Sequence, residues 1–268
     1  MVARPSVINT ANACSVYSAT FDPKRSTNTI FPDDGFPGIV INLIHFEQNQ
    51  IEFDLEKFTV KASAGIFLYR LVLACRDAGL GGTEFLANIP GTVGGAVLMN
   101  AGFSRYAGQR NEIGDLVRQV CAITPSGEKK IFDASELQFS YRHSNLENHV
   151  ILWASFQLWR RPAETIQQEI KANFQYRNKE QDMRYPSSGS IFKNPLGGMS
   201  AGCLIDKAGL KGTKIGGAMV SERHGNYIVN VGQSKSADIK ALIQFVQKAV
   251  FNATGVKLEP EVRIVEKP

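Results

Sequence analysis

Hydrophobic and polar residues alternate over residues 51–62, and this period of two predicts a pair of strands or a hairpin. The apolar positions are Ile51, Phe53 and Leu55, followed by Phe58, Val60 and Ala62. Similar apolar runs bounded by turn residues predict further strands. These runs lie at residues 38–43, on both sides of a Pro-Ser-Gly turn at 125–127, at 150–158 and at 257–265.

Helical periodicity predicts four helices. Residues 66–78 form the first, and Ile166, Ile170 and Phe174 are spaced four apart in a second that covers 163–177. A short helix over 201–208 is expected to end near Gly209 or Gly212. In a longer one that follows, Ser236 is the predicted N-cap and Gly255 the predicted end. Strands and helices mixed in both halves predict an α+β protein.

Composition and charge narrow the functional classes. The chain has 268 residues, 43% of them hydrophobic, which is enough to bury a core in one large or two modest domains. A polar stretch at 178–190 is the predicted junction, with domains at 1–184 and 185–268. The net charge of +5 suits a diphosphate-containing ligand, but Lys and Arg form no run with interleaved aromatics, so nucleic-acid binding is not expected.

Cysteine usage and the N-terminal residues indicate the compartment. The four cysteines form no C-x-x-C pair and have no metal-like spacing with the histidines, which predicts free thiols and no metal site. No apolar run is long enough to span a membrane, and residues 1–20 lack the apolar block of a signal peptide. The sequence therefore predicts a cytoplasmic protein.

Glycine clusters in the segment NIPGTVGGAVLMNAG at 88–102. Gly91, Gly94 and Gly95 could let backbone amides approach a ligand closely and surround a pyrophosphate. The spacing is neither G-x-G-x-x-G nor a P-loop. A tight turn between core elements explains the glycines equally well.

Three further segments carry candidate chemistry. In FSYRHS (139–144), an extended backbone would place Ser140, Arg142 and Ser144 on one side, where the arginine could bind a carboxylate; an exposed strand end is the alternative. In SSGSIFKNP (187–195), Ser190 follows a glycine and could donate a proton, or it could belong to a serine-rich turn. In EPEV (259–262), Glu261 could act at a site or lie on a solvated strand face.

Taken together and in order, five segments resemble the UDP-N-acetylenolpyruvoylglucosamine reductase (MurB) family. They are EFLANIPGTVGGAVLMNAG, ELQFSYRHS, SSGSIFKNP, SAGCLIDKAGLKGTKIGGAMVSERHGNYIVN and LEPEVRIV, and they extend from about residue 28 to the C-terminus. The resemblance implies a vanillyl-alcohol-oxidase-type (VAO/PCMH) FAD-binding domain, incomplete at its N-terminus, followed by a smaller α+β substrate-binding domain. It also implies a cytoplasmic oxidoreductase of peptidoglycan precursor synthesis that uses FAD and NADPH to reduce the enolpyruvyl group of a UDP-N-acetylglucosamine derivative to UDP-N-acetylmuramate.

The resemblance also assigns roles to residues of this chain. Arg142 would stabilise the developing enolate-like anion together with Glu261, and Ser190 would deliver the proton. The substrate-binding residues would be Tyr141, Lys193 and Asn194. The cofactor-binding residues would be Asn28, Pro90, Gly91, Thr92, Gly94, Gly95, Asn100, Ala101 and Gly102.

The N-terminal part departs from the family pattern. The family has a strand–helix–strand unit and a Gly-x-Gly-Ser-Asn phosphate loop, whereas this chain has Lys24, Ser26, Thr27 and Asn28 at the loop positions. Lysine and serine resist the positive φ that such a loop uses. Three explanations stay open: a fragment or wrongly started reading frame, a divergent member that binds FAD weakly, or a partner chain that completes the FAD site.

Two alternative functions follow from the same residues. A non-catalytic, nucleotide-sugar-binding remnant would combine the intact C-terminal segments with the altered loop. A flavin oxidase acting on another substrate is the other alternative, but YRHS and GSIFKNP suit a substrate carboxylate and a nucleotide better than an alcohol. The sequence does not address the oligomeric state.

Overall fold

The computed structural model describes residues 28–37, 40–45, 50–106, 109, 111–182 and 184–266. These residues form two compact units, one from the described residues of 40–176 and one from residues 28–37 together with the described residues of 177–266. The predicted domain boundary after residue 184 stays a prediction. Of the altered phosphate loop, Lys24, Ser26 and Thr27 lie outside the described residues, as does Cys14.

A five-stranded antiparallel sheet organises the first unit, in the order β2-β3-β9-β5-β6. The strands are β2 (Ile51–Asp54), β3 (Thr59–Ser63), β9 (Val150–Gln157), β5 (Val117–Ile123) and β6 (Lys129–Asp133). The predicted hairpin over 51–62, the two strands around the 125–127 turn and the strand over 150–158 are therefore confirmed. Val60, Val120, Ala154 and Phe156 are fully buried on this sheet.

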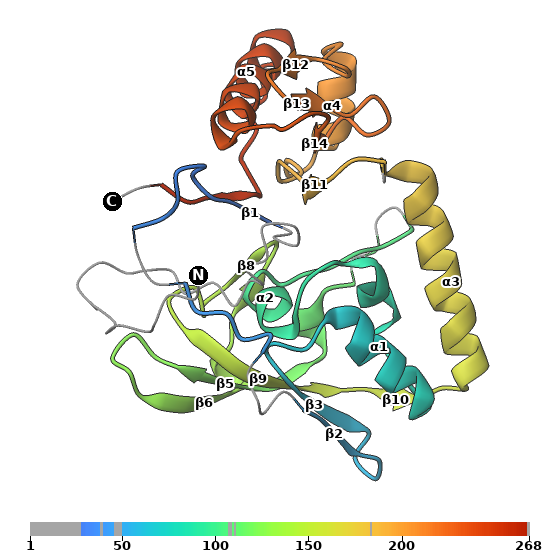
Figure 1. The fold of residues 1–268 in the computed structure, drawn as a ribbon. Helices are drawn as coiled ribbons and strands as arrows, with labels where there is room; N and C mark the ends of the chain where they lie inside the picture. The colour runs from blue at the N-terminus through green and yellow to red at the C-terminus, as the bar shows by residue number, and fades with distance from the viewer. Residues whose placement is uncertain are drawn as a thin grey trace. The chain divides into compact units, whose positions relative to one another are not determined.

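Helices cover one side of this sheet (Figure 1). They are α1 (Leu68–Asp77) and α2 (Val93–Leu98), with α3 (Ala163–Glu180) alongside, and the 3-10 helix η1 (Glu84–Asn88) packs against α1. Leu71, Val72 and Cys75 of α1, Val97 of α2 and Ile166 of α3 are buried in one core. The predicted helices over 66–78 and 163–177 are confirmed. The remaining short elements are β4 (Leu80–Gly81), β10 (Trp159–Arg160), β7 (Phe139–Ser140), β8 (His143–Ser144), η2 (Ile113–Asp115) and η3 (Ala134–Glu136).

The second unit has a four-stranded antiparallel sheet in the order β11-β14-β13-β12 and its own core. Its strands are β11 (Ser187–Ser190), β14 (Tyr227–Asn230), β13 (Ala218–Val220) and β12 (Lys214–Ile215), and its helices are α4 (Ala201–Lys207) and α5 (Ser236–Thr254). The parallel pair β1 (Thr29–Ile30) and β15 (Arg263–Ile264) joins its two distant chain segments. Gly209 and Gly255 have positive φ just after α4 and α5, so both predicted helix ends are confirmed.

Three local predictions are wrong. Residues 40–43 form no strand, and residues 38–39 lie outside the described part of the chain. The last strand is only Arg263–Ile264 long, because Pro260 has no N–H to donate to a ladder and forms only an isolated bridge with Phe192. The N-cap of α5 is Lys235 rather than Ser236, and the Asp238 carboxylate accepts a hydrogen bond from the Lys235 amide at 3.0 Å.

Candidate functional site

The glycine segment forms a loop that leads into α2. Gly91 has a φ of +130°, a conformation that favours glycine, and the neighbouring Pro90 is exposed. The first two amides of α2 already have acceptors within the unit, because Val93 N donates to Ile66 O and Gly94 N donates to Ala64 O, both at 2.9 Å. These two amides are therefore not the pyrophosphate donors that the glycine cluster suggests, and a cofactor role for the loop depends on the close approach that glycine permits.

Asn100 is the centre of a buried hydrogen-bond network behind this loop. It is 1% exposed, and its φ is +43°. Its Nδ2 donates to Glu112 Oε2 at 2.9 Å and to Ser140 O at 3.0 Å, while its Oδ1 accepts from Gly114 N at 3.0 Å. The side chain thus joins three segments of the unit, and its predicted cofactor contact would be made mainly by the backbone.

Glycine is required at position 102 because the backbone of Asn111 lies too close for a side chain. A Cβ at this position would lie 2.4 Å from Asn111 O, which no side chain can tolerate without a backbone shift. Ala101, the residue before it, donates from its amide to Ala96 O at 2.8 Å and accepts from Ile113 N at 2.9 Å. The segment 100–102 is therefore held rigidly in place.

Arg142 lies in a two-residue hairpin turn and not on an extended strand. Phe139 pairs with Ser144 and Ser140 with His143, so Tyr141 and Arg142 form the turn. The predicted common side for Ser140, Arg142 and Ser144 is therefore wrong, because a turn breaks the alternation of a strand.

The position of the Arg142 side chain is set by backbone oxygens. The backbone φ of Arg142 is +58°, which is uncommon for a residue other than glycine and costs conformational energy. The guanidinium donates to Gly102 O at 3.2 Å and to Asn100 O at 3.5 Å, and it lies 4.9 Å from the ring centre of Tyr141. The hairpin is tied to α2 by Ser144 Oγ, which donates to Leu98 O at 2.8 Å. The fold thus brings the predicted anion-binding arginine to the end of the predicted cofactor segment.

One buried side chain tests whether this region fits a bound cofactor. Asn88, at the end of η1, is 5% exposed, and among the described residues neither its Oδ1 nor its Nδ2 has a hydrogen-bond partner. Buried polar atoms normally have partners, so this carboxamide indicates that a polar ligand completes the site. The residues present therefore fit a cofactor such as FAD beside the loop at 88–92.

The second unit brings Ser190 and Glu261 onto neighbouring segments. Ser190 ends β11 and is half-buried, and it pairs with Tyr227 of β14. Glu261 N donates to Ile191 O at 2.7 Å, one residue beyond the serine. Asn28, predicted to bind the cofactor, contacts this same segment, because its Nδ2 donates to Glu261 O at 3.2 Å and its carbonyl accepts from Arg263 N at 2.9 Å.

Lys193 and Asn194 follow on the same segment. Lys193 N donates to Glu259 O at 2.8 Å, and its Nζ lies 3.9 Å from Glu259 Oε2. Asn194 Oδ1 accepts from the Ala201 amide at 3.0 Å, at the first residue of α4. Asn194 therefore orders the loop before α4, in addition to the substrate contact that the resemblance implies.

Tyr227 is a residue near Ser190 that the sequence reasoning missed. Directly paired residues of antiparallel strands have their side chains on the same face, so Tyr227 lies on the face of Ser190. It is 4% exposed, its ring packs edge-on against His224 at 4.7 Å between ring centres, and burial raises the pKa of its phenol. The continuous apolar run at residues 227–229, which is buried throughout, could have indicated this burial, but the pairing with Ser190 depends on the register.

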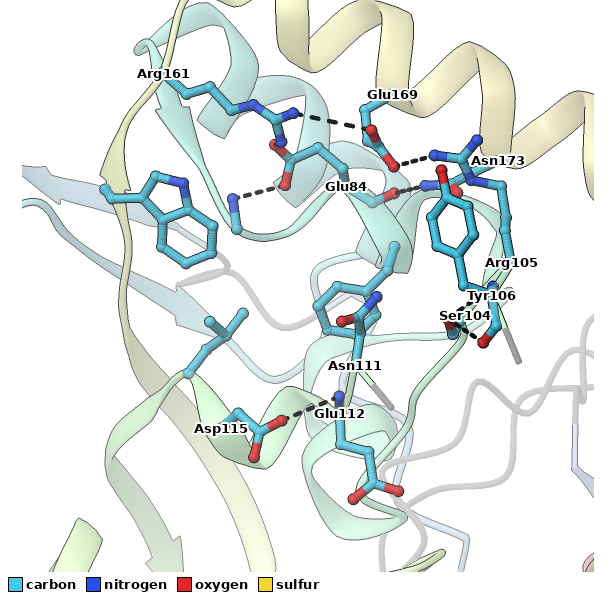
Figure 2. Close-up of a pocket in the computed structure, with 14 residues that line it drawn as sticks. Glu84, Ser104, Arg105, Tyr106, Asn111, Glu112, Asp115, Arg161, Glu169 and Asn173 are labelled. Carbon is cyan, nitrogen blue, oxygen red and sulfur yellow. Dashed lines mark hydrogen bonds and ion pairs between the residues drawn. The ribbon is translucent and has the colours of Figure 1, made fainter. Parts of the chain in front are cut away.

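A separate pocket in the first unit contains none of the predicted site residues. Its volume is about 400 Å³. Figure 2 shows the residues that line it, which are Gly82, Glu84, Phe85, Ser104, Arg105, Tyr106, Asn111, Glu112, Asp115, Leu116, Trp159, Arg161, Glu169 and Asn173. The Glu84 carboxylate accepts from Arg161 at 2.7 Å and from Gly82 N at 2.6 Å, and Arg105 pairs with Glu169. The charges of these four side chains are thus largely compensated within the wall.

The described residues offer neither a metal-binding cluster nor a membrane-spanning helix. Within residues 28–266, leaving aside the undescribed positions, no group of three or more His, Cys, Asp or Glu side chains could hold a metal ion. In the same residues, no helix combines the length and the apolarity that a bilayer crossing requires.

Comparisons with known proteins identify both parts of the chain. The FAD binding domain model matches residues 6–132, and the model of the UDP-N-acetylenolpyruvoylglucosamine reductase C-terminal domain matches residues 181–265. The reductase of Latilactobacillus sakei is 41% identical over 245 residues, which cover 91% of this chain and 78% of that protein. The reductase of Streptococcus pyogenes is 39% identical and covers 90% of this chain and 79% of that protein.

A solved structure agrees with these relatives. The UDP-N-acetylenolpyruvylglucosamine reductase (MurB) of Thermus caldophilus matches with a TM-score of 0.74 and 33% identity, covering 90% of this chain and 83% of that chain. The α+β fold, with an FAD-binding domain and a MurB-type C-terminal domain, follows from these matches. The chain belongs to the UDP-N-acetylenolpyruvoylglucosamine reductase family.

Proposed function

We propose that this chain reduces the enolpyruvyl group of UDP-N-acetyl-3-O-(1-carboxyvinyl)-glucosamine to give UDP-N-acetylmuramate, a precursor of peptidoglycan. The observation that carries this proposal is the match of both parts of one chain to an FAD-binding domain and to the C-terminal domain of this reductase. FAD and NADPH are the cofactors of the family. Neither the comparisons nor the described residues favour the non-catalytic alternative or a flavin oxidase.

When bound, FAD reduced by NADPH would supply the hydride for the methylene carbon of the enolpyruvyl group. Residues of the chain stabilise the negative charge that results and then neutralise it with a proton. As the double bond becomes single, an electron pair develops on the carbon next to the substrate carboxylate. Arg142 stabilises this charge as it spreads into the carboxylate, because a guanidinium can bind both oxygens. Glu261 acts with Arg142 on the substrate carboxylate, either as a protonated acid or through a hydrogen bond, since a bare second carboxylate would oppose the charge that develops.

Ser190 delivers the proton that completes the reduction. Its hydroxyl is a weak acid, but a carbanion is basic enough to accept its proton. The half-buried position of Ser190, one residue before the backbone contact between Ile191 and Glu261, supports this assignment. Tyr141, Lys193 and Asn194 are the proposed substrate-binding residues.

The resemblance implies one set of cofactor-binding residues. The proposed residues are Asn28, Pro90, Gly91, Thr92, Gly94, Gly95, Asn100, Ala101 and Gly102. We place the reaction in the cytoplasm, because the thiols of Cys75, Cys121 and Cys203 are free, as is usual in a reducing compartment.

The test is Ser190→Ala, with Ser187→Ala as the matched control on the same strand. Ser190→Ala is expected to bind FAD and to bleach its visible absorbance with NADPH at the wild-type rate, because the first half-reaction needs no proton from this serine. Reoxidation by the enolpyruvyl substrate should be about 10²- to 10⁴-fold slower, as for loss of a general acid. Ser187 is exposed, and its replacement should change neither rate.

Two results would contradict the proposal. A wild-type protein that takes up no FAD, or does not consume NADPH when the enolpyruvyl nucleotide-sugar is added, would reject the function. A Ser190→Ala enzyme that is reoxidised by substrate at the wild-type rate would reject the role of the serine.

A further inference from the structure

Asn88 differs from other buried asparagines of this chain. Asn226 uses both ends of its carboxamide, because its Nδ2 donates to Phe192 O at 2.8 Å and its Oδ1 accepts from Phe192 N at 2.9 Å. Asn173 donates to Glu84 O at 3.1 Å. Within the described residues, Asn88 uses neither end, although it is as deeply buried as they are.

An unsatisfied carboxamide at this depth destabilises the protein unless something else supplies its partners. Both polar atoms have lost their contact with water without gaining a hydrogen bond. An apolar side chain of similar shape could therefore replace the asparagine without loss of stability. A polar residue kept under these conditions indicates a ligand that binds there in the working protein.

The path of the chain shows where such a ligand would come from. Asn88 is followed by half-buried Ile89 and exposed Pro90, and Gly91 then has a φ of +130°. The chain thus reaches the surface two residues after Asn88, in the loop that contains the proposed cofactor residues Pro90, Gly91 and Thr92. The segment also lies within the part of the chain that matches the FAD binding domain.

We propose that the Asn88 carboxamide binds the pyrimidine edge of the isoalloxazine ring of FAD, an inference that rests on the proposed function. This edge alternates carbonyl acceptors with an imide N–H donor. A carboxamide presents an acceptor beside two donors, so it can form a paired donor–acceptor contact with such an edge. Asn88 is then a further cofactor-binding residue, and its hydrogen bonds to the ring carbonyls influence the electron affinity of the flavin.

The test uses the full-length protein with and without FAD. Asn88→Leu keeps the number of side-chain heavy atoms and replaces the two polar atoms with methyl groups, and Asn88→Ala serves as a second variant in case the bulkier leucine does not fit. Asn173→Ala is the matched control, because it removes a buried asparagine whose hydrogen bond is made within the protein. For each variant we would measure the FAD dissociation constant, the visible flavin spectrum, the flavin reduction potential and the unfolding midpoint of the apoprotein.

The two positions should give opposite patterns. Loss of two hydrogen bonds should weaken FAD binding of the Asn88 variants about 5- to 150-fold. The flavin absorption maxima and the potential should shift, and the apoprotein should be as stable as the wild type or more stable. Asn173→Ala should lower the apoprotein unfolding midpoint and leave FAD affinity, spectrum and potential unchanged.

Three outcomes would overturn this inference. Asn88 variants with wild-type FAD affinity and a less stable apoprotein would show a structural role. Weaker FAD binding with an unchanged spectrum and potential would reject the contact with the isoalloxazine edge. A wild-type chain that takes up no FAD would reject the proposed function itself, which distinguishes that failure from the first two.

Discussion

Arg142 and Asn100 have positive φ values although neither is a glycine, and they are joined in one hydrogen-bond network. Such conformations persist when the surrounding structure determines them strongly, and they occur often at functional sites. Here the Asn100 carboxamide joins three segments, and the Arg142 guanidinium is directed by two carbonyls of the same loop. The position of the arginine thus depends on the loop that also contains proposed cofactor residues.

The first prediction concerns Arg142→Lys. We expect kcat/KM for the enolpyruvyl substrate to fall about 10²- to 10³-fold, similar to the loss of one preorganised donor. A lysine cannot hold two carbonyls in a planar fork and also bind a carboxylate through two parallel hydrogen bonds. The measurement is steady-state kinetics together with thermal unfolding, and the unfolding midpoint should change little.

Arg118→Lys, on an exposed position of β5, is the control for the change of cation and should behave as wild type. Wild-type kcat/KM for Arg142→Lys would show that the arginine does not act on the substrate.

At the scale of elements, the polar stretch after α3 is ordered by a buried carboxylate. The Asp182 side chain is fully buried and accepts hydrogen bonds from Arg184 Nε at 2.9 Å and from Ser221 Oγ at 3.0 Å. Ser221 directly follows β13, so Asp182 connects the stretch after α3 to the sheet of the second unit. The composition of this stretch indicates only a polar junction, whereas the structure shows that one of its residues, Asp182, makes specific buried hydrogen bonds.

The second prediction is a pH-dependent loss of stability in Asp182→Asn. The hydrogen bonds from Arg184, and then that from Ser221, hold the pKa of the Asp182 carboxyl well below its usual value. A lowered acid pKa stabilises the folded state above the unfolded pKa of about 4, and this contribution is lost as the pH falls toward the folded pKa. We expect Asp182→Asn to lower the free energy of unfolding by about 2 kcal/mol at pH 7, with a smaller difference below about pH 4.

Urea unfolding of the two proteins between pH 7 and pH 2 measures this difference. Asp77→Asn is the control, because Asp77 pairs with Arg76 at 2.7 Å but its side chain is 66% exposed, and exposed pairs contribute little. A difference between wild type and Asp182→Asn that stays constant over the whole pH range would exclude the charge of Asp182 as its cause.

At the scale of the whole molecule, the second unit is assembled from segments that are far apart in the sequence. Ile30 belongs to the same core as Leu242, Val246 and Val262. The Asp33 carboxylate accepts from the Ser236 amide at 2.8 Å and from Ser236 Oγ at 2.8 Å, across 203 residues of chain. Since first-turn amides of a helix have no partner within the helix, Asp33 stabilises the start of α5 from outside.

The third prediction is that Asp33→Ala destabilises the second unit by about 0.5–1 kcal/mol, the lower part of the range for helix capping because Asp33 is exposed. Chemical unfolding of Asp33→Ala, Ser236→Ala and the double variant isolates the coupling between the two side chains. Additive effects of the two substitutions would indicate that the hydroxyl–carboxylate contact contributes nothing.

The sequence by itself determined the elements whose pattern is local. The alternation over 51–62 and the four-residue spacing of Ile166, Ile170 and Phe174 each indicate one buried face, and the structure has the hairpin and the helix that they predict. Glycine marked the ends of α4 and α5 for a similar reason, because few other residues adopt a positive φ after a helix. The family was recognisable because its motifs are short contiguous strings in a fixed order.

Only the tertiary structure decided how those strings are used. Arg142 lies in a turn because β7 pairs with β8, and Tyr227 lies opposite Ser190 because of a strand register that no local pattern specifies. Asn28 contacts the Glu261 segment from 233 residues away, and Asn88 is recognised as unsatisfied only when every neighbour is known. Local patterns report which face of a segment is apolar, whereas hydrogen-bond partners and registers depend on contacts between segments that the chain order leaves open.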